Sequence, residues 1–259
     1  TEVFGSTKLT DEVAERRAVE RIEGAGVTGV AADGAAPMLL NTNGGRRALH
    51  AWMVRAPYIG PIVRSFEVQP GGELEVDTDT GSIEISGHDA DEIVVETELG
   101  KSGKWFSWGD NSGHVTYDIS VPANTELDSV DTVNGGVVIS GVSNSVVAES
   151  VNGSIEIEDL SGDTELSTVN GSIEATFARL GGDQSVKAET VNGRVTINLP
   201  EDANVKISAD TLNGGINARD FNLEPDKGYV GSDLNASIGD GSARLNIDTV
   251  NGSIKIRKN

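Results

Sequence analysis

The chain has 259 residues, 32 glycines, 4% aromatic residues, no cysteine and a formal net charge of −21. Without cysteine it has no disulfides, no thiolate metal sites and no cysteine catalysis. The acidic balance argues against nucleic acid as a partner, because phosphate binding needs Lys and Arg on a surface. No apolar run approaches the roughly 18 residues that span a bilayer, so we expect no membrane span.

Charge divides the chain into two regions. Residues 1–64 have a net charge of +1, whereas residues 65–259 have a net charge of −22. We therefore predict an irregular N-terminal cap or assembly segment over 1–64 and one repeat domain over 65–259. The chain begins at Thr1 rather than Met, so we expect that a signal peptide or a tag has been removed. The acidic, cysteine-free and repeat-rich sequence favours an exported protein with an extracellular, cell-surface or periplasmic location.

The N-terminal region contains two predicted features. Acidic residues after Thr10 and a stop at Gly24 predict a short helix over 10–22. The segment 49–63 is the most apolar part of the chain, and its prolines exclude a regular helix. We expect this segment to contribute to assembly through Trp52, Met53, Val54, Tyr58, Ile59, Ile62 and Val63.

The repeat domain opens with alternating apolar residues over 66–76, 82–85 and 93–97, which predict strands. The sequence Asp77-x-Asp79-x-Gly81 resembles the start of a calcium loop, but the later ligands of such a loop are missing. We therefore expect no cofactor, with calcium at Asp77 and Asp79 as the alternative.

Residues 101–113 interrupt the strand pattern with a cluster of aromatic and basic residues. Exposed aromatic rings beside polar groups are suited to stacking on a sugar or to contacting a protein. The alternative is a loop that folds back and caps an open end of the domain. The binding candidates are Trp105, Phe106, Trp108, Lys101 and Lys104.

From residue 133 onward the sequence repeats a short phrase. Val-Asn-Gly-Ser-Ile-Glu occurs at Val151–Glu156 and returns unchanged at Val169–Glu174. Related phrases give successive Asn steps of 18, 18, 22, 21 and 38 residues, the last of about two repeats. The turn residues are Asn134, Gly135, Asn152, Gly153, Asn170, Gly171, Asn192, Gly193, Asn213, Gly214, Asn251 and Gly252.

Each repeat predicts a strand, a turn and a second strand. Asn and Gly tolerate φ > 0 and so permit a sharp turn, and Ser-Ile-Glu-Ile alternates as a half-buried strand does. A unit of roughly 18–22 residues suits one coil of a parallel β-solenoid. The alternative is an antiparallel meander, because Asn-Gly is also a strong hairpin signal. We favour the solenoid, since stacked coils require the same flanking residues at fixed steps.

Stacked coils place equivalent side chains above one another. The turn asparagines are therefore predicted either to form an amide ladder along the axis or to act only as turn residues.

Several of these segments together resemble the bacterial "putative-adhesin" family of β-strand repeat proteins. They are Phe66-x-Val68-x-Pro70-Gly71-Gly72-x-Leu74-x-Val76, Gly81-Ser82-Ile83, Ile119-x-Val121-Pro122 and the serial Val-Asn-Gly-Ser-Ile phrases. The resemblance covers residues 65–259. It implies a right-handed β-solenoid in an exported or envelope-associated protein, and no catalytic residues.

The last repeat, Val250 to Ile256, lies within three residues of the final position, so we expect its strand to be an exposed edge. Such an edge, with Ile254 and Ile256, would receive the apolar head of another copy in a head-to-tail fibre. A blunted edge, protected by Arg257 and Lys258, is the alternative.

The sequence gives little support for catalysis. His50, His88 and His114 occur in unrelated contexts, and Glu156, Glu174 and Asp163 fit the solvated side of alternating strands. We expect a non-enzymatic, adhesin-like surface protein that associates with itself. The alternatives are a module that binds a surface glycan or another envelope component through the Trp105–Trp108 loop and, less favoured, a polysaccharide-cleaving enzyme.

Overall fold

The computed structural model describes residues 30–33, 35–39, 48–51, 62–67, 71–100, 114–228 and 230–259. In this part the chain forms two β-sheets and one short 3₁₀ helix, η1 (Arg219–Phe221), and it has no α-helix. The predicted all-β class is therefore confirmed. The predicted helix over 10–22, the aromatic segment 101–113 and most of the apolar segment 49–63 lie outside the described residues.

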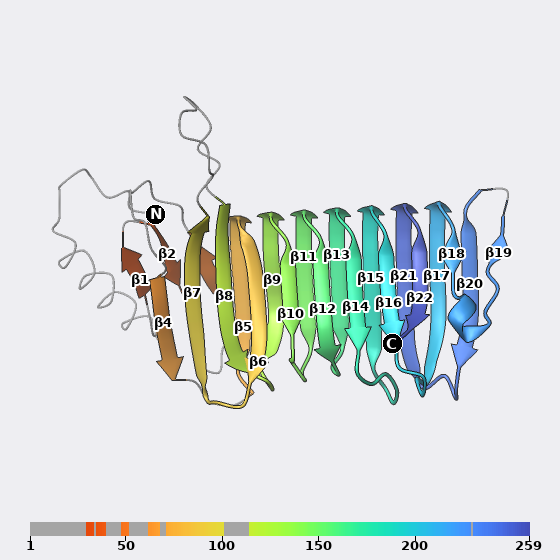
Figure 1. Cartoon of the computed structure of the whole chain (residues 1–259), viewed down its shortest axis with the longest axis horizontal. Coiled ribbons are helices and arrows are strands. Elements are labelled where there is room, and N and C mark those ends of the chain that lie inside the picture. Colours follow the sequence, from red (N-terminus) through yellow and green to blue (C-terminus); the bar gives the residue numbers. More distant parts are fainter. Residues whose placement is uncertain are drawn as a thin grey trace, which may run out of the picture.

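The first sheet, sheet A, has 12 strands. Its strands lie side by side across the long axis of the molecule (Figure 1). In spatial order they are β1 (Val30–Asp33), β2 (Ala35–Leu39), β3 (Ala48–Ala51), β5 (Glu73–Thr80), β9 (Glu126–Asn134), β11 (Val146–Asn152), β13 (Thr164–Asn170), β15 (Ser185–Asn192), β21 (Ala243–Asn251), β17 (Val205–Asn213), β20 (Ser232–Ile238) and β19 (Asp226–Lys227).

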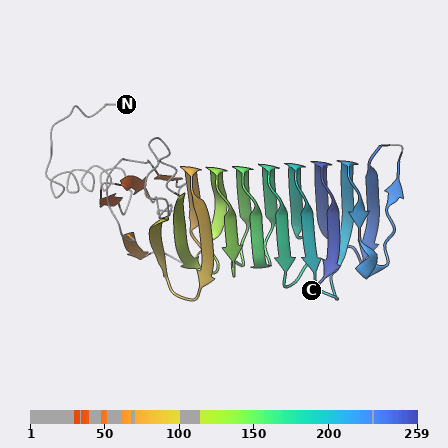
Figure 2. The ribbon, with the colours of Figure 1, turned by 45° about the horizontal axis from the view of Figure 1, so that its top comes forward.

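The second sheet, sheet B, has ten strands and faces sheet A as a second layer (Figure 2). In spatial order they are β18 (Ile216–Asn217), β22 (Ile254–Lys258), β16 (Val195–Leu199), β14 (Ile173–Phe177), β12 (Ile155–Leu160), β10 (Val137–Ser140), β6 (Ser82–His88), β8 (His114–Pro122), β7 (Glu92–Gly100) and β4 (Ile62–Glu67).

An Asn-Gly corner connects six strands of sheet A, namely β9, β11, β13, β15, β17 and β21, to the strand of sheet B that follows each in sequence. Strands on successive coils run parallel and in register, with Ser150 of β11 opposite Thr168 of β13 and Ile155 of β12 opposite Ile173 of β14. The antiparallel meander is therefore wrong for the corners. In the described residues, antiparallel pairs occur towards the two ends of the stack, in β1–β2–β3, β4–β7–β8 and β17–β20–β19.

The core is a narrow layer of aliphatic side chains between the two sheets. Ile155, Ile173 and Val195 form one fully buried row under sheet B, and Leu166 and Ala188 belong to an equivalent row under sheet A. Burial of a branched aliphatic side chain contributes about 1.5–3 kcal/mol. A single coil leaves both of its flanks exposed, so the rows are covered only when coils stack.

The last coil is not at the end of the stack. Strand β21 lies between β15 and β17, and β22 lies between β16 and β18, as Figure 1 shows. The expected exposed edge at β22 is therefore wrong, because both neighbours of this strand are present. Ile254 and Ile256 are buried in the core rather than available to another copy.

The loop before β21 makes this insertion possible. Residues 239–242 connect β20, on one side of β17, to β21 on the other. The loop contacts Asn204 next to β17: Asn204 Oδ1 accepts a hydrogen bond from the Asp240 amide at 3.1 Å, and the Asn204 carbonyl accepts one from the Ala243 amide at 2.9 Å. Gly239 and Gly241 have φ of 61° and 69°, a region that favours glycine.

The corner glycines are needed for space and not for a positive φ. Among the Asn-Gly corners of β9 to β22, neither the Asn nor the Gly has a positive φ, so our conformational explanation of the phrase is wrong. A Cβ on Gly153 would lie 1.7 Å from the Gly135 carbonyl oxygen, and one on Gly171 would lie 1.9 Å from that of Gly153. The corners stack so closely that only glycine fits.

The predicted boundary at Arg64 falls inside β4, which pairs with β7, while β1 to β3 extend sheet A beyond β5. The division into 1–64 and 65–259 remains a prediction.

Two adjacent glycines test the close contact. A Cβ on Gly214 would lie 1.6 Å from the Gly252 carbonyl oxygen, whereas one on Gly215 meets nothing within 4 Å. We expect Gly214→Ala to lower the free energy of unfolding by about 2–4 kcal/mol, the range of severe steric substitutions. Gly215→Ala is expected to be neutral or stabilising by up to about 1 kcal/mol. Urea unfolding measures both, and equal midpoints for the two variants would contradict the tight corner.

Candidate functional site

The corner asparagines form a continuous amide ladder. From Asn152 onward each Nδ2 donates to the Oδ1 of the neighbouring Asn, as in Asn152 to Asn134 at 3.0 Å and Asn170 to Asn152 at 3.0 Å, and the first member, Asn134, donates to the Asp79 carbonyl. Asn251 donates to Asn192 at 2.9 Å and accepts from Asn213 at 2.9 Å. The ladder alternative is therefore confirmed, and its order follows the stack of coils rather than the sequence.

A second ladder of hydroxyl groups holds the corners from inside. Thr168 Oγ1 donates to the Gly153 carbonyl at 2.9 Å, and Thr190 Oγ1 donates to the Gly171 carbonyl at 3.0 Å. Thr211 makes the same bond to Gly252. These nearly buried hydroxyls donate to the corner carbonyls, and a hydrogen-bond partner matters there because an unsatisfied buried carbonyl is costly.

The corner geometry leaves one row of large apolar side chains on the outer face of sheet A. Because alternate residues of a strand face opposite sides, the inward hydroxyl residue places the next residue outward. Apart from Leu212, which is 53% exposed, the members are 39–41% exposed. We call this the apolar row: Val133, Val151, Val169, Val191, Val250 and Leu212.

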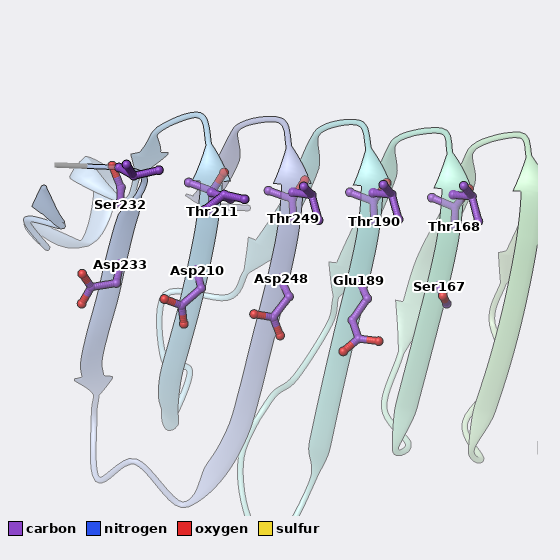
Figure 3. A pocket seen from close by; sticks show the side chains of 15 residues that line it. Ser167, Thr168, Glu189, Thr190, Asp210, Thr211, Ser232, Asp233, Asp248 and Thr249 are labelled. Carbon is purple, nitrogen blue, oxygen red and sulfur yellow. The ribbon is translucent and has the colours of Figure 1, made fainter. Parts of the chain in front are cut away.

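A row of carboxylates lies parallel to the apolar row, two residues earlier on each strand. Glu189 is opposite Asp248, Asp248 is opposite Asp210, and Asp210 is opposite Asp233. Figure 3 shows these four side chains on neighbouring strands, all directed to the same side. We call the full set the acidic row: Asp131, Glu149, Glu189, Asp248, Asp210 and Asp233, with Ser167 in place of an acid on β13.

The two rows line a shallow groove of about 530 Å³ across β13, β15, β21, β17 and β20. Val230, which is 67% exposed, lies at the β20 end of the groove. The residues come from segments as distant as 167 and 250, which the inserted coil brings together. The groove is the candidate functional site of the described residues.

The carboxylates of the groove repel one another. Partial burial, followed by the charges of Asp210 and Glu189, raises the pKa of Asp248, and Lys187 opposes this shift. Lys187 Nζ is 3.0 Å from Glu165 Oε1 and 3.1 Å from Glu189 Oε2, so its charge is already shared by two acids. In the same row at β9, burial raises the pKa of Asp131, and its Oδ1 atom has no hydrogen-bond partner.

The structure places the sequence candidates differently. Trp105, Phe106, Trp108, Lys101 and Lys104 lie outside the described residues, as do Trp52, Met53, Val54, Tyr58 and Ile59, and their roles remain predictions. Ile62 and Val63 belong to β4. Glu156, Glu174 and Asp163 are exposed, as expected for the solvated side of strands.

Within the described ranges, no group of three or more His, Asp or Glu residues is placed to hold a metal ion, and no helix is long and apolar enough to cross a membrane. Calcium at Asp77 and Asp79 remains a prediction.

Sequence reasoning missed the hydroxyl ladder and both rows of the groove. A signal was present, because Ser or Thr stands two residues before every corner Asn, with Val or Leu between them. Strand parity, counted from buried Val186 and Ala188 to Thr190, places Val191 outward.

Two parallel sheets, joined by stacked Asn-Gly corners around a narrow aliphatic core, define a β-solenoid-like repeat protein. The family model described as Toastrack DUF4097 matches residues 106–257, more than half of the chain. The chain belongs to this family, which agrees with the resemblance to a domain family of adhesin-like repeat proteins of unknown function.

Two solved structures are similar in part. A "putative cell adhesion protein" of Clostridium sporogenes shares 17% identity, with 77% of this chain and all of that chain covered, at a TM-score of 0.43. A "putative adhesin" of Bacteroides fragilis shares 13% identity, with 77% of this chain and 98% of that chain covered, at a TM-score of 0.38. A comparison with curated proteins finds no match.

The raised pKa of Asp248 predicts the pH dependence of stability. The folded protein retains the Asp248 proton at a higher pH than the unfolded chain does, so stability is lost as pH rises above the ordinary Asp value of 3.8 through the raised folded pKa. We expect Asp248→Asn to stabilise the protein at pH 7 by less than about 1 kcal/mol, the size of exposed charge interactions.

Urea unfolding from pH 3 to pH 8 measures this effect. The advantage of the variant should shrink as the medium becomes more acidic. Glu156→Gln, at an exposed acid of sheet B, is the control. A variant that is less stable than the natural protein at pH 7 would contradict the repulsion.

Proposed function

We propose that the protein is a non-enzymatic, exported surface protein with an adhesin-like role, and that the groove face of sheet A is its binding surface. The site holds carboxylates and aliphatic side chains in parallel rows, an arrangement suited to contact over an extended face. Membership in the Toastrack DUF4097 family supports the repeat architecture on which this surface depends.

One observation is central to the proposal. Nearly all large apolar side chains of the described coils are buried, yet the apolar row is exposed on six strands in succession. Exposed aliphatic residues in a continuous row tend to mark interaction surfaces, whereas single exposed ones need no explanation. A repeated corner phrase that served only the fold would not require Val or Leu at this outward position.

The proposal includes the path of the chain. We propose right-handed coils of roughly 18–22 residues that stack into a rod. The amide ladder supports this repeat length, because it joins Asn170 to Asn152, 18 residues away, and Asn192 to Asn170, 22 residues away.

Adhesion to native cells tests the binding role. Beads coated with the purified protein are expected to adhere to cells of its own organism. The double variant Val191→Ser/Val250→Ser should reduce the adherent fraction at least threefold, because it removes apolar area from the centre of the groove. Val138→Ser/Val147→Ser, which changes valines outside both rows, is the matched control. Equal adhesion of beads coated with the natural protein and with each of the two double variants would refute the binding surface. Equal adhesion of coated and uncoated beads would refute it as well.

Self-association is the second part of the proposal, and the fold changes its route. Strand β22 is unavailable because it lies inside the stack. The edge strand β19 consists of only two residues, Asp226 and Lys227, and both are charged and exposed. Short charged edges resist pairing. We therefore propose that association uses the apolar segment 49–63 and not the β18–β19 end.

Light scattering across a hundredfold concentration range measures the mass in solution. Average mass is expected to rise with concentration in the natural chain, and Tyr58→Lys/Ile59→Lys should suppress the rise, since buried charges oppose association. Asp226→Lys, at the opposite end, is the control and should leave the rise unchanged. Strictly monomeric protein at the highest concentration would refute self-association.

A further inference from the structure

We propose that the groove on sheet A binds a cationic amphipathic α-helix of a partner protein, lying along the rod axis and across the strands. The helix would place its apolar side on the apolar row and its Lys and Arg side chains over the acidic row. This inference rests on the proposed binding role and adds the chemistry of the partner to it.

The apolar row supplies the contact area. Over the groove its members are Val169, Val191, Val250 and Leu212, and Val230 continues the apolar surface at the β20 end. Each of these side chains is at least 40% exposed. Burial of this area under a ligand is favourable at about 25 cal/mol per Å².

The acidic row determines the charge of the partner. Glu189, Asp248, Asp210 and Asp233 are on four adjacent strands, and Lys187 is the basic residue that contacts this row in the described chain. Cations from a partner would relieve the repulsion between these carboxylates. On its other side the apolar row borders the neutral amide ladder, so the charge contact is confined to one flank of the ligand.

The spacing of the rows matches a helix. Neighbouring strands are about 4.8 Å apart, and successive turns of an α-helix are about 5.4 Å apart. Over four turns the mismatch is about 2.4 Å, half of one strand spacing, so apolar residues on successive turns settle between successive members of the apolar row. The six strands of the apolar row span about 24 Å, the length of about 16 helical residues.

Other occupants fit less well. A second copy of this chain has a net charge of −21, and a copy that presented the same face would place its acidic row against the first. A strand running along the same axis has side chains about 6.8 Å apart on one face, which matches the strand spacing poorly. Neutral and acidic glycans lack the cations, all glycans lack an aliphatic stripe, and anionic lipid is repelled by the carboxylates.

The experiment uses the full chain and a designed probe. The probe is a fluorescein-labelled 16-residue helix with a stripe of Leu at i, i+3, i+4 and i+7 positions and Lys on its flanks. Fluorescence anisotropy at 150 mM salt is expected to show saturable binding. A peptide of the same composition with the stripe scrambled, and one with Glu in place of Lys, should each bind at least tenfold more weakly.

Paired variants test whether the groove is the site. Asp210→Asn/Asp248→Asn should weaken binding at least tenfold, whereas Glu156→Gln/Glu174→Gln, which removes two charges in register on sheet B, should change it less than threefold. Val191→Ser/Val250→Ser should also weaken binding at least tenfold, with Val138→Ser/Val147→Ser as its control. Circular dichroism and urea midpoints verify that each variant is folded.

Three outcomes would overturn the inference. The first is the absence of saturable probe binding, and the second is unchanged probe binding by Val191→Ser/Val250→Ser. The third is an equal loss of probe affinity in Asp210→Asn/Asp248→Asn and Glu156→Gln/Glu174→Gln, which would indicate general attraction to an acidic rod. The bead assay keeps this result separate from the proposed function. If the beads adhere but the probe does not bind, only the proposal of a helical partner is refuted. If the probe binds but the beads do not adhere, only the proposed adhesive role is refuted.

Discussion

Register between successive corners is the constraint on which the remaining structure depends. At each corner a glycine contacts the glycine carbonyl of the adjacent coil, an Asn side chain bonds to the next Asn, and a Ser or Thr hydroxyl bonds to a corner carbonyl. These contacts fix the height and the lateral position of every coil. Because side chains alternate strictly along a strand, a slip of one residue would turn the aliphatic core outward. The same contacts align the apolar and acidic rows.

Much of the fold could be predicted from the sequence because its repeats are local. The phrase around Asn152 and Asn170 predicts strands, a corner and parallel stacking, and all three are present. The order of the coils could not be predicted. The Asn213 and Asn251 corners have nearly the same sequence and so the same capacity to stack on Asn192. The step of 38 residues between Asn213 and Asn251 suits two consecutive coils as well as one inserted coil, and only the complete set of contacts distinguishes them.

The candidate site was less accessible to sequence reasoning than the fold. The repeated phrase predicts a strand before each corner but not the side that Val191 faces, because its outward position depends on the parity set by Val186 and Ala188 further back in β15. Predicting the acidic row from the sequence would also require the order of the coils, because Glu189, Asp248 and Asp210 become neighbours only through the inserted coil. Residues that repeat in the sequence form a row along the axis of the stack, but the order in which the coils stack determines which of these residues are adjacent.

The inserted coil also affects how the protein is made. Residues 243–258 leave the ribosome after residues 205–238, yet they lie between those residues and the coil formed by β15 and β16. Coils up to β16 can stack in chain order, each on the coil before it, whereas β17 has no neighbour on the β15 side until β21 is synthesised. The rod can therefore grow in chain order only as far as β16, and residues 205–258 can close on it only once β21 and β22 have been synthesised.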